Sequence, residues 1–274
     1  MDPLSAIVLG LVQALTEFLP VSSSGHLVLA HEILDVSQKE GLAADAFAVA
    51  VHFGTLLSVI VVFWSDIKNL VIAFLSSLKA PRSIPAGLRQ DPQLQLVAAI
   101  VIGCIPAGLV GLLFKDELES AFSSTRLVCT ALIATGCILL LTRIFSGGVK
   151  TVSLGTGLVI GLAQAVAIIP GVSRSGSTIA VALFLGLERE HAARYSFLLS
   201  LPVIAGASLL KSLELMGQAL PTSAWTSLGL GAGVAFFVGI LALRMLMLVV
   251  RRGAFAHFGW YCLALGSTGL FLLK

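Results

Sequence analysis

Charged residues are scarce in this chain, and that scarcity decides its class. Asp, Glu, Lys and Arg make up 11% of the 274 residues, whereas 57% are hydrophobic and the mean hydropathy is +1.02. Soluble domains carry about 25% charged residues, so a soluble globular fold is excluded. The apolar runs are unbroken rather than alternating, which disfavours a transmembrane β-barrel. The sequence therefore predicts an all-α polytopic membrane protein.

Cysteine and terminal basic residues are also few. The four cysteines, Cys104, Cys129, Cys137 and Cys262, lie in apolar runs without metal-ligand spacing, so we expect small buried hydrophobic side chains. No basic region precedes the first apolar run, so we expect no cleaved signal peptide. The net charge is only +3, and we expect membrane lipids rather than nucleic acid as partners.

Six apolar runs are long enough to cross a bilayer, which takes about 20 helical residues. They are Phe47–Trp64, Leu94–Phe114, Leu127–Phe145, Tyr195–Leu213, Leu228–Val250 and Ala254–Leu273. Two other regions, 4–34 and 154–187, are interrupted by Pro, Gly and Ser near their centres. We expect each to form a re-entrant helical hairpin, because irregular backbone at membrane depth must be buried in protein or line a water-filled cavity.

The two interrupted regions are copies of one another. Seven residues recur 151 positions later, namely Gly10, Leu11, Gln13, Ala14, Ser22, Ser24 and Gly25. Three predicted spans separate the copies, and an odd number inverts the second. We expect one membrane domain, 1–274, built as an inverted-topology repeat of approximately 1–150 and 151–274, with the hairpin tips meeting near the midplane.

Basic residues orient the chain. Of the 17 Lys and Arg residues, eleven fall on one predicted face, five fall on the other, and Arg174 lies inside. The positive-inside rule makes the face with eleven cytoplasmic. Both termini are then periplasmic.

The first hairpin holds polar residues that a membrane segment rarely carries. Gln13 and Glu17 are four residues apart and share a helix face. An intramembrane carboxylate costs about 2.5–3.5 kcal/mol unless it is paired or hydrated, and such residues are usually functional. Ser22, Ser23 and Ser24 precede a second helix, which one of them is expected to cap. The same helix N-terminus can bind an anion.

Histidine can add proton transfer to this site. His26 follows Ser23 by three residues, on the same predicted helix face, so its imidazole is expected to take or orient the hydroxyl proton. His52 is alone in its span, and we expect it to pack.

The second hairpin carries an arginine at its turn, where residues 170–178 read PGVSRSGST. A glycine-flanked turn that opens a helix presents several N–H groups to one anion. Arg174 adds a planar fork of donors that matches phosphate. The predicted substrate-binding residues are Gln13, Ser22, Ser24, Gly171, Ser173, Ser175, Gly176, Ser177 and Thr178. A phosphate site inside the membrane suits a substrate with a phosphate head and a hydrophobic tail.

Both motifs resemble the two signatures of the undecaprenyl-diphosphate phosphatase family, of the bacitracin-resistance type and not the PAP2 type. The resemblance extends over nearly the whole chain. It implies removal of the terminal phosphate of undecaprenyl diphosphate at the periplasmic side of the bacterial inner membrane, which recycles the lipid carrier for cell-wall synthesis. The family's Glu/Gln-x-x-x-Glu pattern falls on Gln13 and Glu17.

The resemblance further implies that Glu17, Ser23, His26 and Arg174 are catalytic. It also implies a divalent cation, magnesium or calcium, with Glu17 as its ligand. Whether Ser23 or His26 attacks phosphorus, or Glu17 activates water directly, stays open.

Two other interpretations stay open. Inverted repeats with broken helices are also a transporter design, so the alternative function is a transporter or flippase of a lipid phosphate or anion. The Gly157-x-x-x-Gly161 and Gly229-x-x-x-Gly233 pairs allow a homodimer, although packing within the chain is favoured.

The charge distribution yields a test of topology. The loop 79–92 is predicted to be cytoplasmic, so a cysteine at Ser83→Cys should resist a membrane-impermeant thiol reagent in intact cells. Strong labelling from outside would contradict the orientation.

Overall fold

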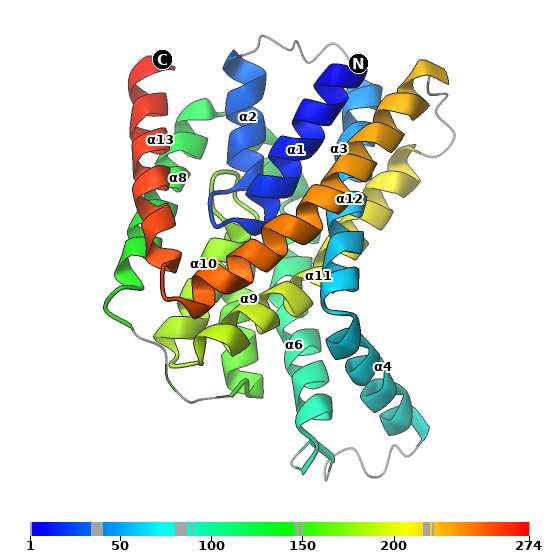
Figure 1. Cartoon of the computed structure of the whole chain (residues 1–274), viewed down its shortest axis with the longest axis vertical. Coiled ribbons are helices and arrows are strands. Elements are labelled where there is room, and N and C mark those ends of the chain that lie inside the picture. The colour runs from blue at the N-terminus through cyan, green and yellow to red at the C-terminus, as the bar shows by residue number, and fades with distance from the viewer. Residues whose placement is uncertain are drawn as a thin grey trace.

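The computed structural model describes residues 2–33, 41–79, 87–88, 90–145, 148, 151–215, 220 and 222–273, which are almost entirely helical and contain no β-strand (Figure 1). The helices are α1 (Pro3–Phe18), α2 (Ser23–Ile33), α3 (Gly41–Val62), α4 (Trp64–Lys79), α6 (Pro92–Leu113), α7 (Lys115–Phe122), α8 (Thr125–Leu141), α9 (Leu154–Val166), α10 (Arg174–Phe184), α11 (Arg189–Leu215), α12 (Thr222–Arg251), η3 (Phe255–His257) and α13 (Phe258–Leu272). The predicted all-α membrane class is confirmed.

Five segments among the described residues are long and apolar enough to cross a membrane. They lie on α3, α6, α11, α12 and the combined η3 and α13. A sixth is reached if α8 is counted with α7, from which it is bent by 94°. Each of the six predicted runs overlaps one of these helices, so the expected number of spans agrees with the structure.

The two interrupted regions each form a pair of short helices joined by an irregular turn. Residues 19–22 separate α1 from α2, and residues 167–173 separate α9 from α10. Both turns contain a left-handed residue, Ser22 with φ 69° and Gly171 with φ 92°. Glycine adopts this conformation without strain, whereas for serine it costs energy and is characteristic of functional sites.

The second helix of each pair starts at a serine cap. Ser22 Oγ accepts a hydrogen bond from the Gly25 N–H at 3.2 Å, and Ser173 Oγ accepts one from the Gly176 N–H at 3.1 Å. These four residues are two pairs of positions 151 apart. The prediction that one of the three serines caps the first of these helices is therefore confirmed, with Ser22 in that role.

The first helix of each pair packs closely on a long helix through glycine. A Cβ atom at Gly10 of α1 would lie 2.7 Å from the carbonyl oxygen of Gly231 in α12. Gly161 of α9 approaches Gly103 of α6 more closely still. Small residues allow such backbone contact between membrane helices, so each short helix is held in a fixed rotation.

These contacts also explain one of the Gly-x-x-x-Gly pairs. Gly157 packs on Ala99, where a Cβ atom on the glycine would lie 2.9 Å from the alanine carbonyl oxygen, and Gly161 packs on Gly103. This pair therefore serves packing within the chain. Gly229 has no atom within 4 Å of its Cβ position, and the homodimer stays a prediction.

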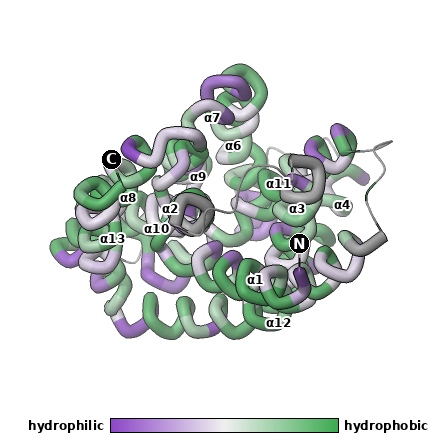
Figure 2. Tube along the Cα trace, turned by 90° about the horizontal axis from the view of Figure 1, so that it is seen from above, coloured by the Kyte–Doolittle hydropathy of each residue, from purple (hydrophilic) through white to green (hydrophobic). Residues whose placement is uncertain are grey.

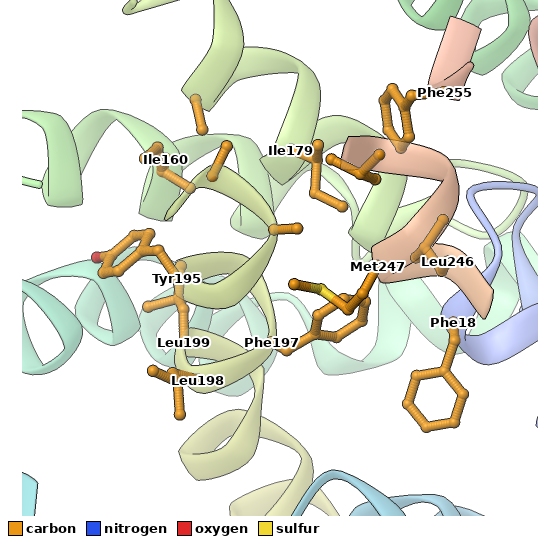
Figure 3. Close-up of a cluster of buried hydrophobic side chains, with 14 of the residues drawn as sticks. Phe18, Ile160, Ile179, Tyr195, Phe197, Leu198, Leu199, Leu246, Met247 and Phe255 are labelled. Carbon is orange, nitrogen blue, oxygen red and sulfur yellow. The ribbon is translucent and has the colours of Figure 1, made fainter. Parts of the chain in front are cut away.

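A hydrophobic cluster joins both short helix pairs to the long helices (Figure 3). It contains Phe18 of α1, Ile160 of α9, Ile179 of α10, Phe197 of α11 and Leu246 of α12. Phe18 and Phe197 meet edge to face, with ring centroids 5.9 Å apart. This cluster fixes the positions of α1 and α10 relative to the long helices.

Ionic groups gather at two levels of the molecule. Lys211 pairs with Asp45 at 3.1 Å, and Arg194 pairs with Asp66 at 2.9 Å. Lys211 and Arg194 both lie on α11, about 25 Å apart at 1.5 Å per residue. Hydrophobic residues predominate along outer helices such as α12, seen from above in Figure 2. Both termini lie at the same end of the molecule (Figure 1); that this end is periplasmic stays a prediction.

One helix was not predicted, and one expectation needs correction. The helix α4 continues beyond α3 after a break at Phe63, in a segment for which the sequence analysis made no prediction. Cys129 and Cys262 are buried as expected, but Cys104 is half-buried and Cys137 is exposed on the outer surface. Apolar surface facing lipid costs nothing, so burial in protein cannot be inferred from an apolar run alone.

The glycine contact between α9 and α6 predicts a matched pair of stability effects. Gly161→Ala places a methyl group against the Gly103 backbone, so we expect it to lower the free energy of unfolding by about 1–3 kcal/mol. Gly108 lies on α6, as Gly103 does, and has no atom within 4 Å of its Cβ position. Gly108→Ala should therefore be neutral or stabilise by up to about 1 kcal/mol through helix propensity. Thermal unfolding in detergent compares them; equal melting temperatures would contradict the packing.

Candidate functional site

The turns of the two short helix pairs lie against each other. The Gly171 N–H donates to Ser24 Oγ at 3.4 Å, across 147 residues of sequence, and Ser175 Oγ donates to the Leu19 carbonyl at 3.4 Å. A Cβ at Gly25 would lie 3.3 Å from the Gly171 Cα. The polar halves of both motifs are thereby brought to one place.

Long helices support each turn from the side. Thr135 of α8 donates through Oγ1 to the Gly171 carbonyl at 3.2 Å and accepts from the Ser173 N–H at 3.1 Å. Cys262 of α13 donates through Sγ to the Pro20 carbonyl at 3.5 Å. The irregular backbone is thus satisfied inside the protein, as membrane depth requires.

This bonding differs from the expected cradle of backbone amides after Gly171. The Gly171 N–H is taken by Ser24, the Val172 N–H by the Ile169 carbonyl at 3.1 Å, and the Ser173 N–H by Thr135. These groups hold the turn together and do not point a set of free donors at an anion. Arg174 therefore takes the larger part in any anion binding.

Arg174 forms an ion pair with Glu17 from the other motif. Arg174 Nη2 lies 2.5 Å from Glu17 Oε1, and the side chains are only 15% and 7% exposed. A buried charge is costly unless it is paired and hydrogen-bonded, so the two motifs depend on each other. The predicted convergence of Glu17 and Arg174 is seen here directly.

The second carboxylate oxygen of Glu17 holds two further residues of the first motif. Ser23 Oγ donates to Glu17 Oε2 at 2.8 Å, and Gln13 Nε2 donates to the same oxygen at 3.1 Å. The carboxylate is therefore in position to accept the proton of the Ser23 hydroxyl. Gln13 orients it from one turn earlier on α1.

A cavity of about 410 Å³ opens onto these groups. Its polar lining comprises Thr16, Glu17, Ser22, Ser23, Ser24, Asp45, His52, Gln164, Ser173, Arg174, Ser208 and Lys211. Its apolar lining includes Val203 and Ile204 of α11. A polar end beside an apolar wall is the form expected of a site for an amphipathic substrate.

Four buried polar atoms have no hydrogen-bond partner among the described residues. They are Gln13 Oε1, both amide atoms of Gln164, and Arg174 Nη1. Buried polar groups are rarely left unpaired. Arg174 and Gln164 line the cavity, so a polar ligand there can satisfy them.

His26 does not lie where the sequence placed it. Its Nδ1 lies 2.8 Å from the Ser22 carbonyl oxygen, and its Nε2 lies 2.7 Å from the Tyr261 hydroxyl, on whose ring it stacks. It lines a separate apolar groove between α1, α2 and α13. The spacing of three residues aligned His26 with Ser23, but Ser23 turns toward Glu17. The expected contact between Ser23 and His26 is therefore absent here.

His52 of α3, rather than His26, lies beside the Glu17 carboxylate. It lines the cavity, and its Nε2 lies 3.9 Å from Glu17 Oε2. Its Nδ1 donates to the Ala48 carbonyl oxygen at 2.8 Å, which leaves Nε2 on the side of Glu17. The expectation that His52 only packs is wrong, because His52 lines the cavity beside Glu17. His52 lies in a long span outside both motifs, so nothing in the sequence indicated this neighbour.

Of the nine predicted substrate-binding residues, Ser22, Ser24 and Ser173 line the cavity, and the other six, which include Gln13 and Gly171, do not. Ser175, Ser177 and Thr178 are buried in α10, and Thr178 Oγ1 donates to the Arg174 carbonyl at 2.8 Å. Gly176 packs on Ser173. These residues shape the start of α10, whereas Ser173 and Arg174 face the cavity.

Gln164 is the second residue that sequence reasoning passed over. The signal was present, since Gln164 is the repeat counterpart of Gln13. Without a carboxylate four residues later, it resembled an ordinary polar residue in an apolar run.

The fold and the site together define a polytopic helical membrane protein with a serine, a carboxylate and an arginine at an embedded cavity. This combination is suited to phosphoryl transfer, in which charge neutralisation and positioning dominate. The family model of bacitracin resistance protein BacA matches residues 6–268. The chain belongs to this family.

Individual relatives agree. A protein from Salinibacter ruber named undecaprenyl-diphosphatase is 44% identical over 269 residues, covering 98% of each chain. Proteins of the same name from Desulforapulum autotrophicum and Korarchaeum cryptofilum are 42% and 38% identical, covering 98% and 100% of each chain.

The geometry predicts that Arg174 is needed for more than its charge. Arg174→Lys keeps a cation but loses the planar fork that can hold Glu17 and a phosphate at once. We expect turnover to fall by about 10²-fold or more, as for loss of a preorganised oxyanion donor. Steady-state phosphate release measures this. Near wild-type turnover in a folded variant would show that Arg174 only supports the structure.

Proposed function

We propose that this enzyme hydrolyses undecaprenyl diphosphate to undecaprenyl phosphate and inorganic phosphate. Its relatives carry the name of that activity, and the product is the lipid carrier of cell-wall synthesis, which accounts for bacitracin resistance in the family. The observation that carries the proposal is the contact of Ser23 and Arg174 with the two oxygens of Glu17.

The favoured mechanism starts at Ser23. Glu17 accepts the hydroxyl proton across the 2.8 Å hydrogen bond, and Ser23 Oγ attacks the terminal phosphorus. The bond from that phosphorus to the bridging oxygen breaks, and undecaprenyl phosphate leaves with the electron pair. Arg174 Nη1, which has no partner among the described residues, is available to stabilise the charge on the transferred phosphoryl oxygens. Water then attacks the phosphoserine and releases inorganic phosphate.

The other residues support this chemistry without sharing bonds to phosphorus. Gln13 holds the Glu17 carboxylate, and Ser22, in its left-handed conformation, caps the helix on which Ser23 lies. His26 binds the Ser22 carbonyl, so we assign it a positioning role at the same turn. Direct attack by His26, or by water activated at Glu17, remains the alternative.

A divalent cation is part of the proposal. No group of three or more His, Cys, Asp or Glu side chains suited to a metal occurs among the described residues. The unpartnered oxygen of Gln13 and the Glu17 carboxylate nevertheless are the hard donors that magnesium and calcium prefer. Glu17, which lines the cavity, would hold the ion together with substrate oxygens, and the ion would neutralise phosphate charge.

We further propose that both short helix pairs are re-entrant hairpins of an inverted repeat in a single membrane domain. Support comes from the equivalent serine caps and from the glycine contacts Gly10–Gly231 and Gly161–Gly103. The Lys211 end would then face the periplasm and the Arg194 end the cytoplasm. The cavity lies on the Lys211 side, so in this orientation the site and both termini would be at the periplasmic face of the inner membrane.

Transport of a lipid phosphate is the second candidate function, since the same repeat design serves transporters. The Ser23–Glu17 hydrogen bond favours hydrolysis, because transport of an anion needs donors but no base beside a hydroxyl. Phosphate release from undecaprenyl diphosphate in detergent, where no compartments exist, decides between them. Release that stops with chelator and returns with magnesium or calcium supports hydrolysis with a cation; no release under any of these conditions would refute hydrolysis.

The contacts of the serines predict which one reacts. Ser23→Ala should abolish turnover because the nucleophile is lost. Ser24→Ala should retain a measurable fraction, because it loses the hydrogen bonds to the Gly171 N–H and to Ser22 Oγ but keeps the nucleophile. Trapping of the phosphorylated enzyme should give acid-stable phosphate on Ser23. Acid-labile phosphate on His26 would overturn this assignment.

A further inference from the structure

Gln164 is a buried amide with no partner among the residues that the structure describes. It lies on α9, two residues before that helix ends at Val166, and the residue is only 2% exposed. Neither amide atom has a hydrogen-bond partner in that part of the chain, and the residue lines the cavity. Leaving such a group unsatisfied costs about 1–3 kcal/mol.

The comparison with Gln13 shows what Gln164 lacks. Gln13 donates to Glu17, four residues further along α1. Four residues after Gln164 stands Ile168, whose side chain offers no acceptor. Two amides at equivalent repeat positions therefore have different surroundings, and only the N–H of the first has an acceptor on its own helix.

The fold prevents Gln164 from turning away. Its neighbour Gly161, one turn earlier, is pressed against the Gly103 backbone of α6, where even a Cβ atom has no room. Rotation of α9 would break this contact, so Gln164 stays at the cavity wall. A ligand in the cavity is then the available partner.

The other free donor at the cavity indicates what this ligand is. Arg174 Nη1 is also buried and has no partner among the described residues, and a guanidinium N–H together with an amide N–H selects an anion with several oxygens. We propose that Gln164 is a phosphate-binding residue, whose side-chain N–H holds a non-bridging oxygen of the terminal phosphate together with Arg174 Nη1. The assignment rests on the phosphate site proposed above.

Gln164 is a substrate-binding residue, because it contacts phosphate oxygens but exchanges no proton. A hydrogen bond to a charged group that is present in both the ground state and the transition state changes KM more than kcat. Its loss should raise KM on the order of tenfold or more, with a smaller change in kcat.

Gln164→Leu tests this, with Gln95→Leu in α6 as the matched control, since Gln95 lines a different pocket. Thermal unfolding is measured in detergent with and without inorganic phosphate, and kcat and KM are measured on undecaprenyl diphosphate. We expect Gln164→Leu to be at least as stable as wild type without phosphate. It should lose most of the stabilisation by phosphate and show the raised KM. Gln95→Leu should behave as wild type.

Other results would overturn the inference. A Gln164→Leu variant with wild-type KM and phosphate response would show that the amide does not bind phosphate, and lower stability without phosphate would show a structural role. Gln164→Glu keeps the shape but repels phosphate, so an unchanged KM there also contradicts the proposal. Arg174→Lys in the same assays distinguishes failure of the Gln164 proposal from failure of the proposed phosphate site. If Arg174→Lys also keeps the wild-type response to phosphate, the phosphate site itself is wrong.

Discussion

The ion pair between Glu17 and Arg174 is the interaction on which the rest of the structure depends. Both side chains are nearly buried, and a buried charge without its partner costs several kcal/mol. One member comes from each short helix pair, so neither turn can hold its charged residue at this depth alone. The caps at Ser22 and Ser173, and the support from Thr135, place the two turns where the pair can form.

The same pair prepares the site for phosphate. Arg174 uses Nη2 for Glu17 and leaves Nη1 without a partner among the described residues, while Glu17 uses its other oxygen for Ser23. Stability and reactivity thus share one carboxylate. An arriving phosphate can meet the free donor of Arg174 without first breaking the ion pair, and the serine proton already has its acceptor.

Much of this arrangement could be predicted from the sequence. The apolar runs predicted the long helices, and the Pro, Gly and Ser residues that interrupt two of the runs predicted the breaks at 19–22 and 167–173. Both signals depend only on residues that are neighbours in the sequence. The 151-residue repeat and the resemblance to a known family pointed to Glu17, Ser23 and Arg174. The predictions that failed concern which neighbour a group contacts in the folded chain. His26 contacts Tyr261, and His52 reaches Glu17 from another helix. The Gly171 amide is bonded by Ser24. Sequence spacing fixes which face a residue shares with its neighbours, but not which helix will pack against that face.

A double-mutant cycle on Glu17→Gln and Arg174→Gln, read as the free energy of unfolding in detergent, tests the central claim most directly. If the pair joins the two turns, each single variant leaves a buried charge uncompensated and should lose about 3–5 kcal/mol, whereas the double variant should lose no more than either single one. Two losses that simply add in the double variant would contradict the account, because they would show that Glu17 and Arg174 do not depend on each other.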